Sequence, residues 1–357
     1  MSQRLIAAFI AVPAALGLIL YAATARLPYA TYAPGSTVDV LGTTDTDAPI
    51  VTVDGAETYE DGGQLRMTTV RVSEAAATGE TPGLSLWDLM AVWFDGDNAV
   101  YPYDAVHAPD ETPRSNEQEG AQQMADSQDY AVEVALSELG YDVPQVVKVA
   151  QVTPDSPSDG VLSENDVLRS VDGTDIGGDA QLRNLIQRRG VEGEPLEIGI
   201  TRDGKDRTVE VVPTTTDGRL LIGILTGIDY DFPVDVSIAI DPRIGGPSAG
   251  LVFSLAVYDT LTPGSLTGGH DVAGTGEIYP DGTVGPIGGI QQKIAGARQD
   301  GAELFLVPEA NCADALAADN NGDMRLMRAS TMHEVRVALE AYAEDTDADL
   351  PSCEDAA

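Results

Sequence analysis

Apolar and polar residues follow different patterns in successive parts of the chain. Residues 5–25 contain no charged side chain, and about 20 apolar residues in a row can cross a hydrocarbon core of ~30 Å. Residues 27–113 consist of short apolar runs broken by turn dipeptides such as Pro34-Gly35, a pattern typical of β-strands. We therefore expect a transmembrane helix in residues 1–26 and a small β-rich domain after it.

One short helix is expected inside the β-rich domain. Its apolar residues are spaced so that they face a core. They are Leu84, Leu86, Trp87, Leu89, Met90 and Trp93. The domain contains no catalytic arrangement of side chains, so its sequence gives no indication of its role.

Residues 5–25 also fit a cleaved signal sequence. Arg4 precedes them, and Ala23-Thr24-Ala25 satisfies the small-residue rule for signal peptidase. The apolar stretch is longer than the usual signal core of about 7–15 residues, which favours an anchor. We expect a single-pass protein of the cell membrane, with the acidic remainder of the chain outside the cytoplasm.

After the β-rich domain, helical spacing replaces the strand pattern. Within residues 114–140 we expect a connecting helix that begins at Ser127 and ends at Gly140. Residues 141–215 then alternate short strands with one amphipathic helix that contains Leu182.

Residues 216–343 alternate strands with helices. Residues 249–260 form a helix that is apolar almost all round and hence buried, and residues 290–299 form a second helix. The final residues, 344–357, are acidic with few apolar side chains, so we expect a mobile tail. The chain is thus predicted to be an α+β protein with three folded parts after its N-terminal segment.

Charge and residue usage exclude several kinds of function. Asp and Glu number 58 against 20 Lys and Arg, and the net charge of −38 would repel nucleic acid. Neither Cys312 nor Cys353 belongs to a CxxC pair, and His333-Glu334 lacks the second histidine of HExxH, so no metal site is predicted. No GxxxxGK[ST] sequence occurs, so we expect neither a nucleotide nor another cofactor.

A serine follows a proline where a predicted strand gives way to a helix. Pro247 suits the first position of a helix, which places Ser248 among the free N–H groups of the first turn. Such groups stabilise the oxyanion that forms when a serine attacks a carbonyl. We expect Gly246, Pro247 and Ala249 to bind substrate around this oxyanion, with a base that activates Ser248.

Lys293 can supply the base. It lies near the start of the helix at 290–299, in line with Ile290 and Ala297 on a face that should be buried. Burial and the positive end of the helix both disfavour an ammonium ion, and only a neutral amine can accept the serine proton. A lysine that reaches from an apolar face to water would occupy the same position, so Lys293 alone does not decide.

Residues 141–215 resemble a bacterial PDZ domain. The resemblance rests on Thr-Pro-Asp-Ser-Pro at 153–157, Gly-Val-Leu-Ser-Glu-Asn-Asp-Val-Leu at 160–168, Val-Asp-Gly at 171–173 and a hairpin turn at Asp203-Gly204. PDZ domains bind peptide ends by strand addition. Leu139-Gly140-Tyr141 is a candidate for the loop that binds the terminal carboxylate, and a spacer of the same fold is the alternative.

Residues 216–343 resemble the proteolytic domain of Lon. The motifs are GGPSAG at 245–250, GTGEI at 274–278 and GPIGGIQQK at 285–293. The resemblance implies that Ser248 is the nucleophile, Lys293 its base, and Thr275 a hydroxyl that helps to hold the lysine. It also implies assembly of several copies, of a number that the sequence does not fix. Lon usually has Asp where this chain has Gly245, which puts any role of that carboxylate in doubt.

The order of segments resembles the PDZ-containing, membrane-anchored Lon-like proteases, which lack an ATPase domain. This resemblance implies an ATP-independent serine endopeptidase, with its catalytic part outside the cytoplasm. Its substrates would be flexible envelope or membrane-proximal polypeptides, selected in part by the PDZ domain. Two alternatives stand beside it: an α/β-hydrolase-type esterase that pairs Ser248 with His333, and a non-enzymatic envelope adaptor that uses only the PDZ domain.

The two cysteines are expected to form one disulfide. Cys312 and Cys353 flank the final helical segment, their number is even, and an extracytoplasmic location permits oxidation. Two free thiols are the alternative.

Overall fold

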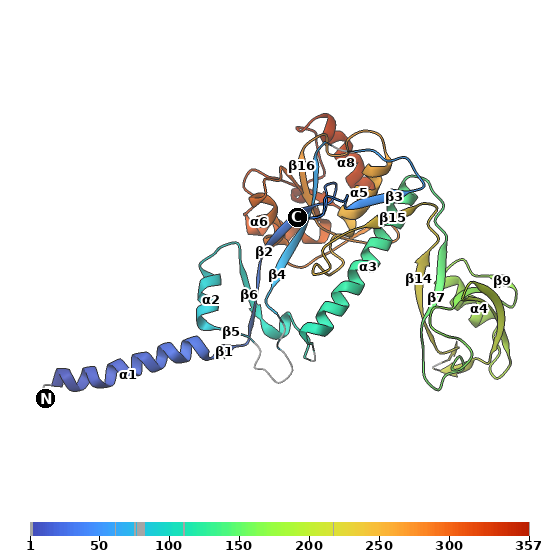
Figure 1. Ribbon diagram of the computed structural model, residues 1–357, viewed down its shortest axis with the longest axis horizontal. Coiled ribbons are helices and arrows are strands. Elements are labelled where there is room, and N and C mark those ends of the chain that lie inside the picture. Colours follow the sequence, from blue (N-terminus) through green and yellow to red (C-terminus); the bar gives the residue numbers. More distant parts are fainter. Residues whose placement is uncertain are drawn as a thin grey trace. The chain divides into compact units, whose positions relative to one another are not determined.

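The computed structural model describes residues 3–60, 62–74, 76, 83–109, 111–216 and 218–356, with the backbone alone for 3–8 and 356. Met1, Ser2, the side chain of Arg4 and Ala357 belong to the predicted anchor and tail and lie outside this description. The chain forms two compact units (Figure 1). The first holds the residues up to Leu139 and from Val234 onward, and the second is Gly140–Pro233.

The core of the first unit is a six-stranded mixed sheet. In spatial order its strands are β20 (Arg325–Ala329), β19 (Leu304–Pro308), β16 (Asp271–Gly274), β4 (Gln64–Val72), β2 (Tyr29–Asp39) and β6 (Ala99–Pro102). The first four run parallel, whereas β2 and β6 pair antiparallel. β19 is apolar and buried along its whole length, as expected of a central parallel strand.

Helices pack around this sheet. They are α3 (Pro113–Glu138), α5 (Gly250–Leu261), α6 (Ile290–Gln299), α7 (Cys312–Ala318) and α8 (Met332–Glu344). α5 is largely buried because its sequence is apolar on every side, and α3 packs against it. Thr112 caps α3 and Pro113 occupies its first turn, so α3 begins well before Ser127, the predicted start.

Residues 27–113 do not form a sheet of their own in this structure. Leu65 and Met67 of β4 are buried in the middle of a sheet that also contains β16 and β19. Short pairs complete the unit: β1 (Arg26–Leu27) with β5 (Leu84–Ser85), β3 (Val51–Asp54) with β15 (Asp235–Ile238), and β17 (Glu277–Ile278) with β18 (Val284–Gly285). The alternation of apolar residues predicts such strands but not their distant partners.

The N-terminal helix α1 (Gln3–Thr24) coincides with the apolar stretch at 5–25. Within the described part of the chain, no helix combines the length and the apolar character needed to cross a membrane. The predicted transmembrane segment is therefore not supported.

The helix α2 (Leu86–Trp93) does not form the predicted core. Leu89 is its one buried residue, whereas Trp87 is 50% exposed and Trp93 78% exposed. The spacing of apolar residues predicts the helix correctly, but a helix apolar on most sides gives no sign of which side faces the core.

The second unit contains a six-stranded antiparallel sheet and a helix. Its strands, in order, are β11 (Lys205–Val211), β10 (Leu196–Arg202), β8 (Val167–Val171), β7 (Gln145–Val152) and β14 (Ile224–Tyr230), with β9 (Thr174–Asp175) beside β8. The helix is α4 (Asp179–Arg189), and a small hairpin pairs β12 (Thr214–Thr216) with β13 (Arg219–Leu221). The predicted turn at Asp203-Gly204 is confirmed, since Arg202 pairs with Lys205 across it.

The acidic C-terminal segment packs against the first unit. Leu350 and Cys353 are buried, and Ser352 forms a β-bridge with Met327 of β20. The prediction of a mobile tail at 344–357 is therefore wrong over this part, because these few apolar residues outweigh the acidic composition around them.

Candidate active site

Ser248 lies in the loop that leads from β15 to α5. Helix α5 begins at Gly250, with Ala249 as its N-cap, so Ser248 stands immediately before the helix rather than inside its first turn. Its carbonyl oxygen accepts hydrogen bonds from the N–H of Gly276, at 2.8 Å, and from Thr275 Oγ1, at 2.9 Å. These two bonds fix the backbone of the serine against residues 275 and 276, which connect β16 to β17.

Lys293 reaches Ser248 from the second turn of α6. Its Nζ lies 2.7 Å from Ser248 Oγ and 2.8 Å from Thr275 Oγ1, and only 2% of the residue is exposed. Burial lowers the pKa of Lys293 from its ordinary value to about 7, because an ammonium ion loses its hydration there. A substantial fraction of the lysine is thus a neutral amine near pH 7.

Thr275 orients the lysine. Its hydroxyl donates to the carbonyl of Ser248, which leaves the oxygen of Thr275 to accept a hydrogen from Lys293 Nζ. One hydrogen of the amine is thereby directed at Thr275, and the nitrogen lone pair can face Ser248 Oγ. The structure thus brings together all three residues that the sequence singled out for catalysis.

The N-terminus of α6 approaches the strands closely at Gly289. This residue has φ of +70°, and an added Cβ would lie 2.7 Å from Val70 Cγ1. Glycine meets both requirements, the left-handed backbone and the close approach. Gly289 lets α6 pack closely against β2 and β4, and this close packing brings Lys293 within reach of Ser248.

The residues expected to bind the oxyanion differ in what they can donate. Pro247 has no N–H, and the N–H of Gly246 donates to the carbonyl of Gly120 in α3, at 2.9 Å. The N–H groups of Ser248 and Ala249 donate to no backbone acceptor within the described residues. Ser248 and Ala249 are therefore the best-placed donors for an oxyanion.

Helix α3 holds the serine loop, a role that was not predicted from the sequence. Besides the Gly120 contact, Ser127 Oγ donates to the carbonyl of Pro247 at 3.0 Å. Gly120 is the eighth residue of α3. A glycine inside a helix costs stability, so its presence there could have indicated a close backbone contact.

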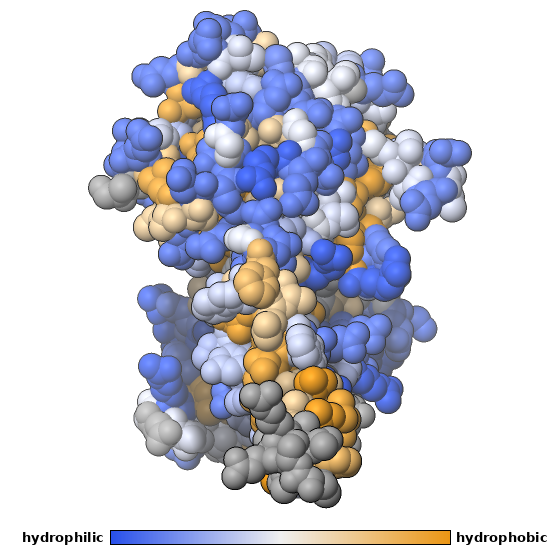
Figure 2. Space-filling view, turned by 90° about the vertical axis from the view of Figure 1, so that its left-hand side faces the viewer, coloured by the Kyte–Doolittle hydropathy of each residue, from blue (hydrophilic) through white to orange (hydrophobic). Residues whose placement is uncertain are grey.

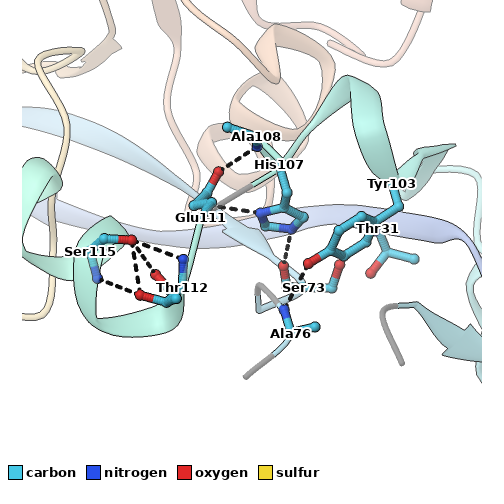
Figure 3. A network of polar contacts seen from close by, with 9 residues as sticks. All are labelled: Thr31, Ser73, Ala76, Tyr103, His107, Ala108, Glu111, Thr112 and Ser115. Atoms are coloured by element: carbon cyan, nitrogen blue, oxygen red, sulfur yellow. Dashed lines mark hydrogen bonds and ion pairs between the residues drawn. The ribbon is translucent and has the colours of Figure 1, made fainter. Parts of the chain in front are cut away.

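A buried network fixes the segment that precedes α3 (Figure 3). His107 is 3% exposed, its Nε2 lies 3.0 Å from the carbonyl of Ser73, and its Nδ1 lies 3.0 Å from Glu111 Oε1. Tyr103 adds a contact by accepting the N–H of Ala76 at 2.7 Å. Ser73 directly follows β4, so the network joins β4 to the start of α3.

A cavity of about 420 Å³ opens at Ser248 and Lys293. It is lined by Ser36, residues 67–71 of β4, Met124 of α3, Asp241, residues 243–245 and Ala249. β4 pairs with β16 only as far as Met67. Beyond that residue β4 stays paired with β2 on one edge, whereas the edge that faced β16 has no partner strand along the cavity. At the end of the β4–β16 pairing, the hydroxyl of Thr68 donates a hydrogen bond to the carbonyl of Gly274 at 3.1 Å.

His333 takes no part in this site. It does not line the cavity, it is 63% exposed at its side chain, and its Nδ1 lies 2.8 Å from Glu138 Oε1. The geometry therefore gives no support to the esterase that pairs Ser248 with His333. The described residues also contain no cluster of side chains suited to a metal ion.

The second unit has a groove of its own, of about 710 Å³. It runs between α4, which contributes Leu182, Arg183 and Ile186, and residues 219–226. β14 is an edge strand, so its outer side faces this groove. The candidate loop Leu139-Gly140-Tyr141 is not part of it.

A short motif in the sequence could have indicated the groove. Ile222-Gly223-Ile224 alternates apolar residues around a glycine with φ of +78°, directly before β14. An added Cβ at Gly223 would lie 2.2 Å from Ser156 Cβ, so any residue other than glycine would clash here.

Comparison with known proteins matches both units. Residues 234–341 match the Lon protease (S16) C-terminal proteolytic domain, and residues 121–212 match a PDZ domain. "Lon protease 1" of Herpetosiphon aurantiacus is 34% identical over 125 residues, which are 34% of this chain and 15% of that protein. "Lon protease 2" of the same organism is 43% identical over 76 residues, which are 21% of this chain and 9% of that protein.

The chain therefore spans less than a fifth of the length of these relatives. Among solved structures, the PDZ domain of an SdrC-like protein from Listeria monocytogenes is 24% identical, with a TM-score of 0.21. The match covers 22% of this chain and 85% of that domain. Residues 234–341 are thus similar to the proteolytic domain of Lon proteases, and residues 121–212 to PDZ domains.

Proposed function

Since the chain carries a Lon-type proteolytic domain, we propose that it is a serine endopeptidase in which Ser248 and Lys293 form the catalytic dyad. The observation that carries this proposal is the 2.7 Å separation of Ser248 Oγ and the buried Lys293 Nζ. Burying a lysine without a carboxylate partner destabilises the fold. Such residues occur more often at catalytic sites, and Lys293 contacts a serine beside a cavity.

Catalysis follows from the protonation state of the lysine. Neutral Lys293 removes the proton of Ser248 as Oγ attacks the peptide carbonyl, and the N–H groups of Ser248 and Ala249 stabilise the oxyanion. The resulting ammonium then gives its proton to the leaving amine, which leaves an acyl group on Ser248. A water molecule, deprotonated by Lys293, hydrolyses this ester and restores the free serine.

The substrate is proposed to be a flexible polypeptide in an extended conformation. Beyond Met67, β4 lies along the cavity without the partner strand β16, so an extended peptide can add to it beside Ser248. A folded chain cannot present such a strand. The 357 residues contain no sequence for ATP binding, so we propose cleavage without nucleotide, of polypeptides that are already unfolded.

The groove of the second unit is proposed to select substrates. Its walls combine the edge strand β14, the apolar side chains of Leu182 and Ile186, and the cation of Arg183. These features suit a peptide with an apolar C-terminal residue and a free carboxylate. Arg183→Glu should weaken the binding of such a peptide about tenfold, whereas Arg188→Glu, on the same helix but outside the groove, should not.

We also propose that the catalytic domain works outside the cytoplasm, on envelope or membrane-proximal polypeptides. The disulfide between Cys312 and Cys353 supports this location, because stable disulfides form in oxidising compartments. Assembly of several copies is proposed from the resemblance to Lon alone, and sedimentation of the purified protein tests it.

A fluorophosphonate probe, which reacts with activated serines, tests the dyad directly. The wild-type chain should be labelled and Ser248→Ala should not. Ser36→Ala is the matched control, since Ser36 lines the same cavity but is not part of the dyad, and it should be labelled like wild type. Labelling of Ser248→Ala would disprove the assignment. An unlabelled wild type that still binds peptides would favour the non-enzymatic adaptor.

A further inference from the structure

The short helix α2 turns a stripe of large apolar side chains to the outside. Trp93 is 78% exposed and Phe94, its C-cap residue, 81% exposed. The other members of the stripe are Leu86, Trp87 and Met90. At 3.6 residues per turn, the five positions fall within an arc of about 120°, so they form one continuous surface. A continuous exposed apolar surface usually marks a site where a protein binds a partner or a membrane.

The stripe is held in a fixed orientation. Ser85 and Asp88 form a reciprocal capping box at the start of α2, and Leu89, next to the stripe on the helix surface, is buried. The helix also packs against β6, whose Tyr101 is 40% exposed. The aromatic side chains are thus presented outward by a helix that is anchored from within.

Helix α1 lies next to α2 and is apolar on every side. Its exposed apolar residues, each more than half exposed, are Phe9, Ile10, Val12, Leu16, Leu18, Ile19, Leu20 and Tyr21. Figure 2 looks at the side of the molecule that carries both helices, and hydrophobic residues gather in its lower half. A protein partner would cover one side of α1, whereas the surface of a bilayer can receive the apolar side chains of both helices together.

We propose that α2 lies in the interface of a lipid bilayer, with Trp87, Trp93 and Phe94 among the headgroups and upper acyl chains. Tryptophan and tyrosine favour this zone because their rings are apolar and carry one polar group. A helix that lies in the plane of the interface needs no spanning length. This role is independent of the proposed peptidase activity.

The charges around α2 indicate which lipid. Asp88 lies on the helix and Asp95 follows it, and the whole chain has a net charge of −38. Asp97, a little further on, is paired with Arg298 at 2.9 Å. Anionic headgroups are therefore repelled, and zwitterionic phosphatidylcholine is the expected surface.

Tryptophan emission reports on α2 alone, because Trp87 and Trp93 are the two tryptophans of the chain. When the full chain is mixed with phosphatidylcholine vesicles, the emission should shift to shorter wavelength, and phosphatidylcholine brominated on its acyl chains should quench it. Unchanged emission in the presence of vesicles would overturn the proposal. So would a shift that appears without lipid and grows with protein concentration, because a second copy would then cover the face.

A double variant tests the stripe itself. Trp93→Ser with Phe94→Ser should weaken partition into the vesicles at least about tenfold, since two large apolar side chains are lost from the lipid. Both side chains are exposed, so the fold should persist. Val337→Ser on α8, 46% exposed, is the control and should partition like wild type. Equal partition of the double variant and the control would refute the assignment.

Discussion

The backbone of Gly120, inside α3, lies directly against the backbone of Gly245, three residues before Ser248. The Gly246 N–H donates to the Gly120 carbonyl at 2.9 Å, and a Cβ added at Gly245 would lie 2.9 Å from the carbonyl carbon of Gly120. The loop therefore has no room for a side chain at this contact unless the loop or α3 moves. The aspartate that Lon usually has at this position would therefore not fit here.

Gly245→Asp should lower kcat/KM for an unfolded polypeptide by about tenfold to a hundredfold, because it displaces the loop that positions Ser248. Gly288→Ala is the control: an added Cβ there meets no atom within 4 Å, and activity should stay near wild type. Full activity of Gly245→Asp would show that the contact with Gly120 does not position the loop.

Lys293→Ala should reduce turnover by about three orders of magnitude or more, since Ser248 then has no base. Lys293→Arg should not restore it, because a guanidinium remains charged and cannot accept the proton. Circular dichroism should show both variants folded. Turnover within tenfold of wild type for Lys293→Ala would exclude the dyad.

The rate of cleavage should rise with pH to a plateau, with a midpoint near pH 7. Burial lowers the pKa of Lys293 to about 7, and only the deprotonated amine is active, so activity is lost as the pH falls below that value. The profile of kcat/KM against pH measures the midpoint in the free enzyme. A midpoint near pH 10 would mean that the lysine titrates as if exposed.

The same pKa shift predicts a stability penalty. Between about pH 7 and 10.5 the unfolded lysine binds a proton that the folded one lacks, so wild-type stability rises with pH across this range. In a Ser248→Ala background, which prevents self-cleavage, Lys293→Met should therefore unfold less readily at pH 7, by about a few kcal/mol. The gain should shrink by pH 10. Urea titration at both pH values checks it, and a gain independent of pH would point to packing instead.

Loss of the disulfide should destabilise the first unit. Cys312 and Cys353 are both buried and are 41 residues apart, so the chain-entropy model predicts about 3–4 kcal/mol. Reductant should lower the unfolding temperature of wild type but not that of a variant with alanine at both positions. Two alkylatable thiols in protein purified without reductant would contradict the pairing.

The sequence alone singles out Ser248, Lys293 and Thr275, and the structure brings these three side chains together. A Pro-Ser-Ala-Gly sequence before an apolar helix indicates the nucleophile. A lysine on an apolar helix face has other uses, so Lys293 is singled out only together with the motif around it. The separation of Ser248 and Lys293 is then fixed by two helix positions in one unit.

The sheet is harder to predict because its pairings join distant segments. The apolar alternation around Leu65 and Met67 predicts a strand, but nothing in it indicates that β16 is the neighbour. The prediction of the buried side of α2 fails for a related reason. Trp87 and Leu89 are both large and apolar, and only the complete fold decides which one is buried. The groove beside β14 was missed because β14 lies beyond the predicted end of its domain.

The second unit interrupts the first along the sequence, and this order governs when the first unit can fold during synthesis. Residues 140–233 are continuous, so they can fold as soon as they leave the ribosome. The catalytic sheet cannot, because β4 must wait for β16, β19 and β20, which are made after the whole second unit. Lys293 likewise joins Ser248 only late in synthesis. The growing chain thus exposes its own unfolded segments, which are potential substrates, before it can cut anything.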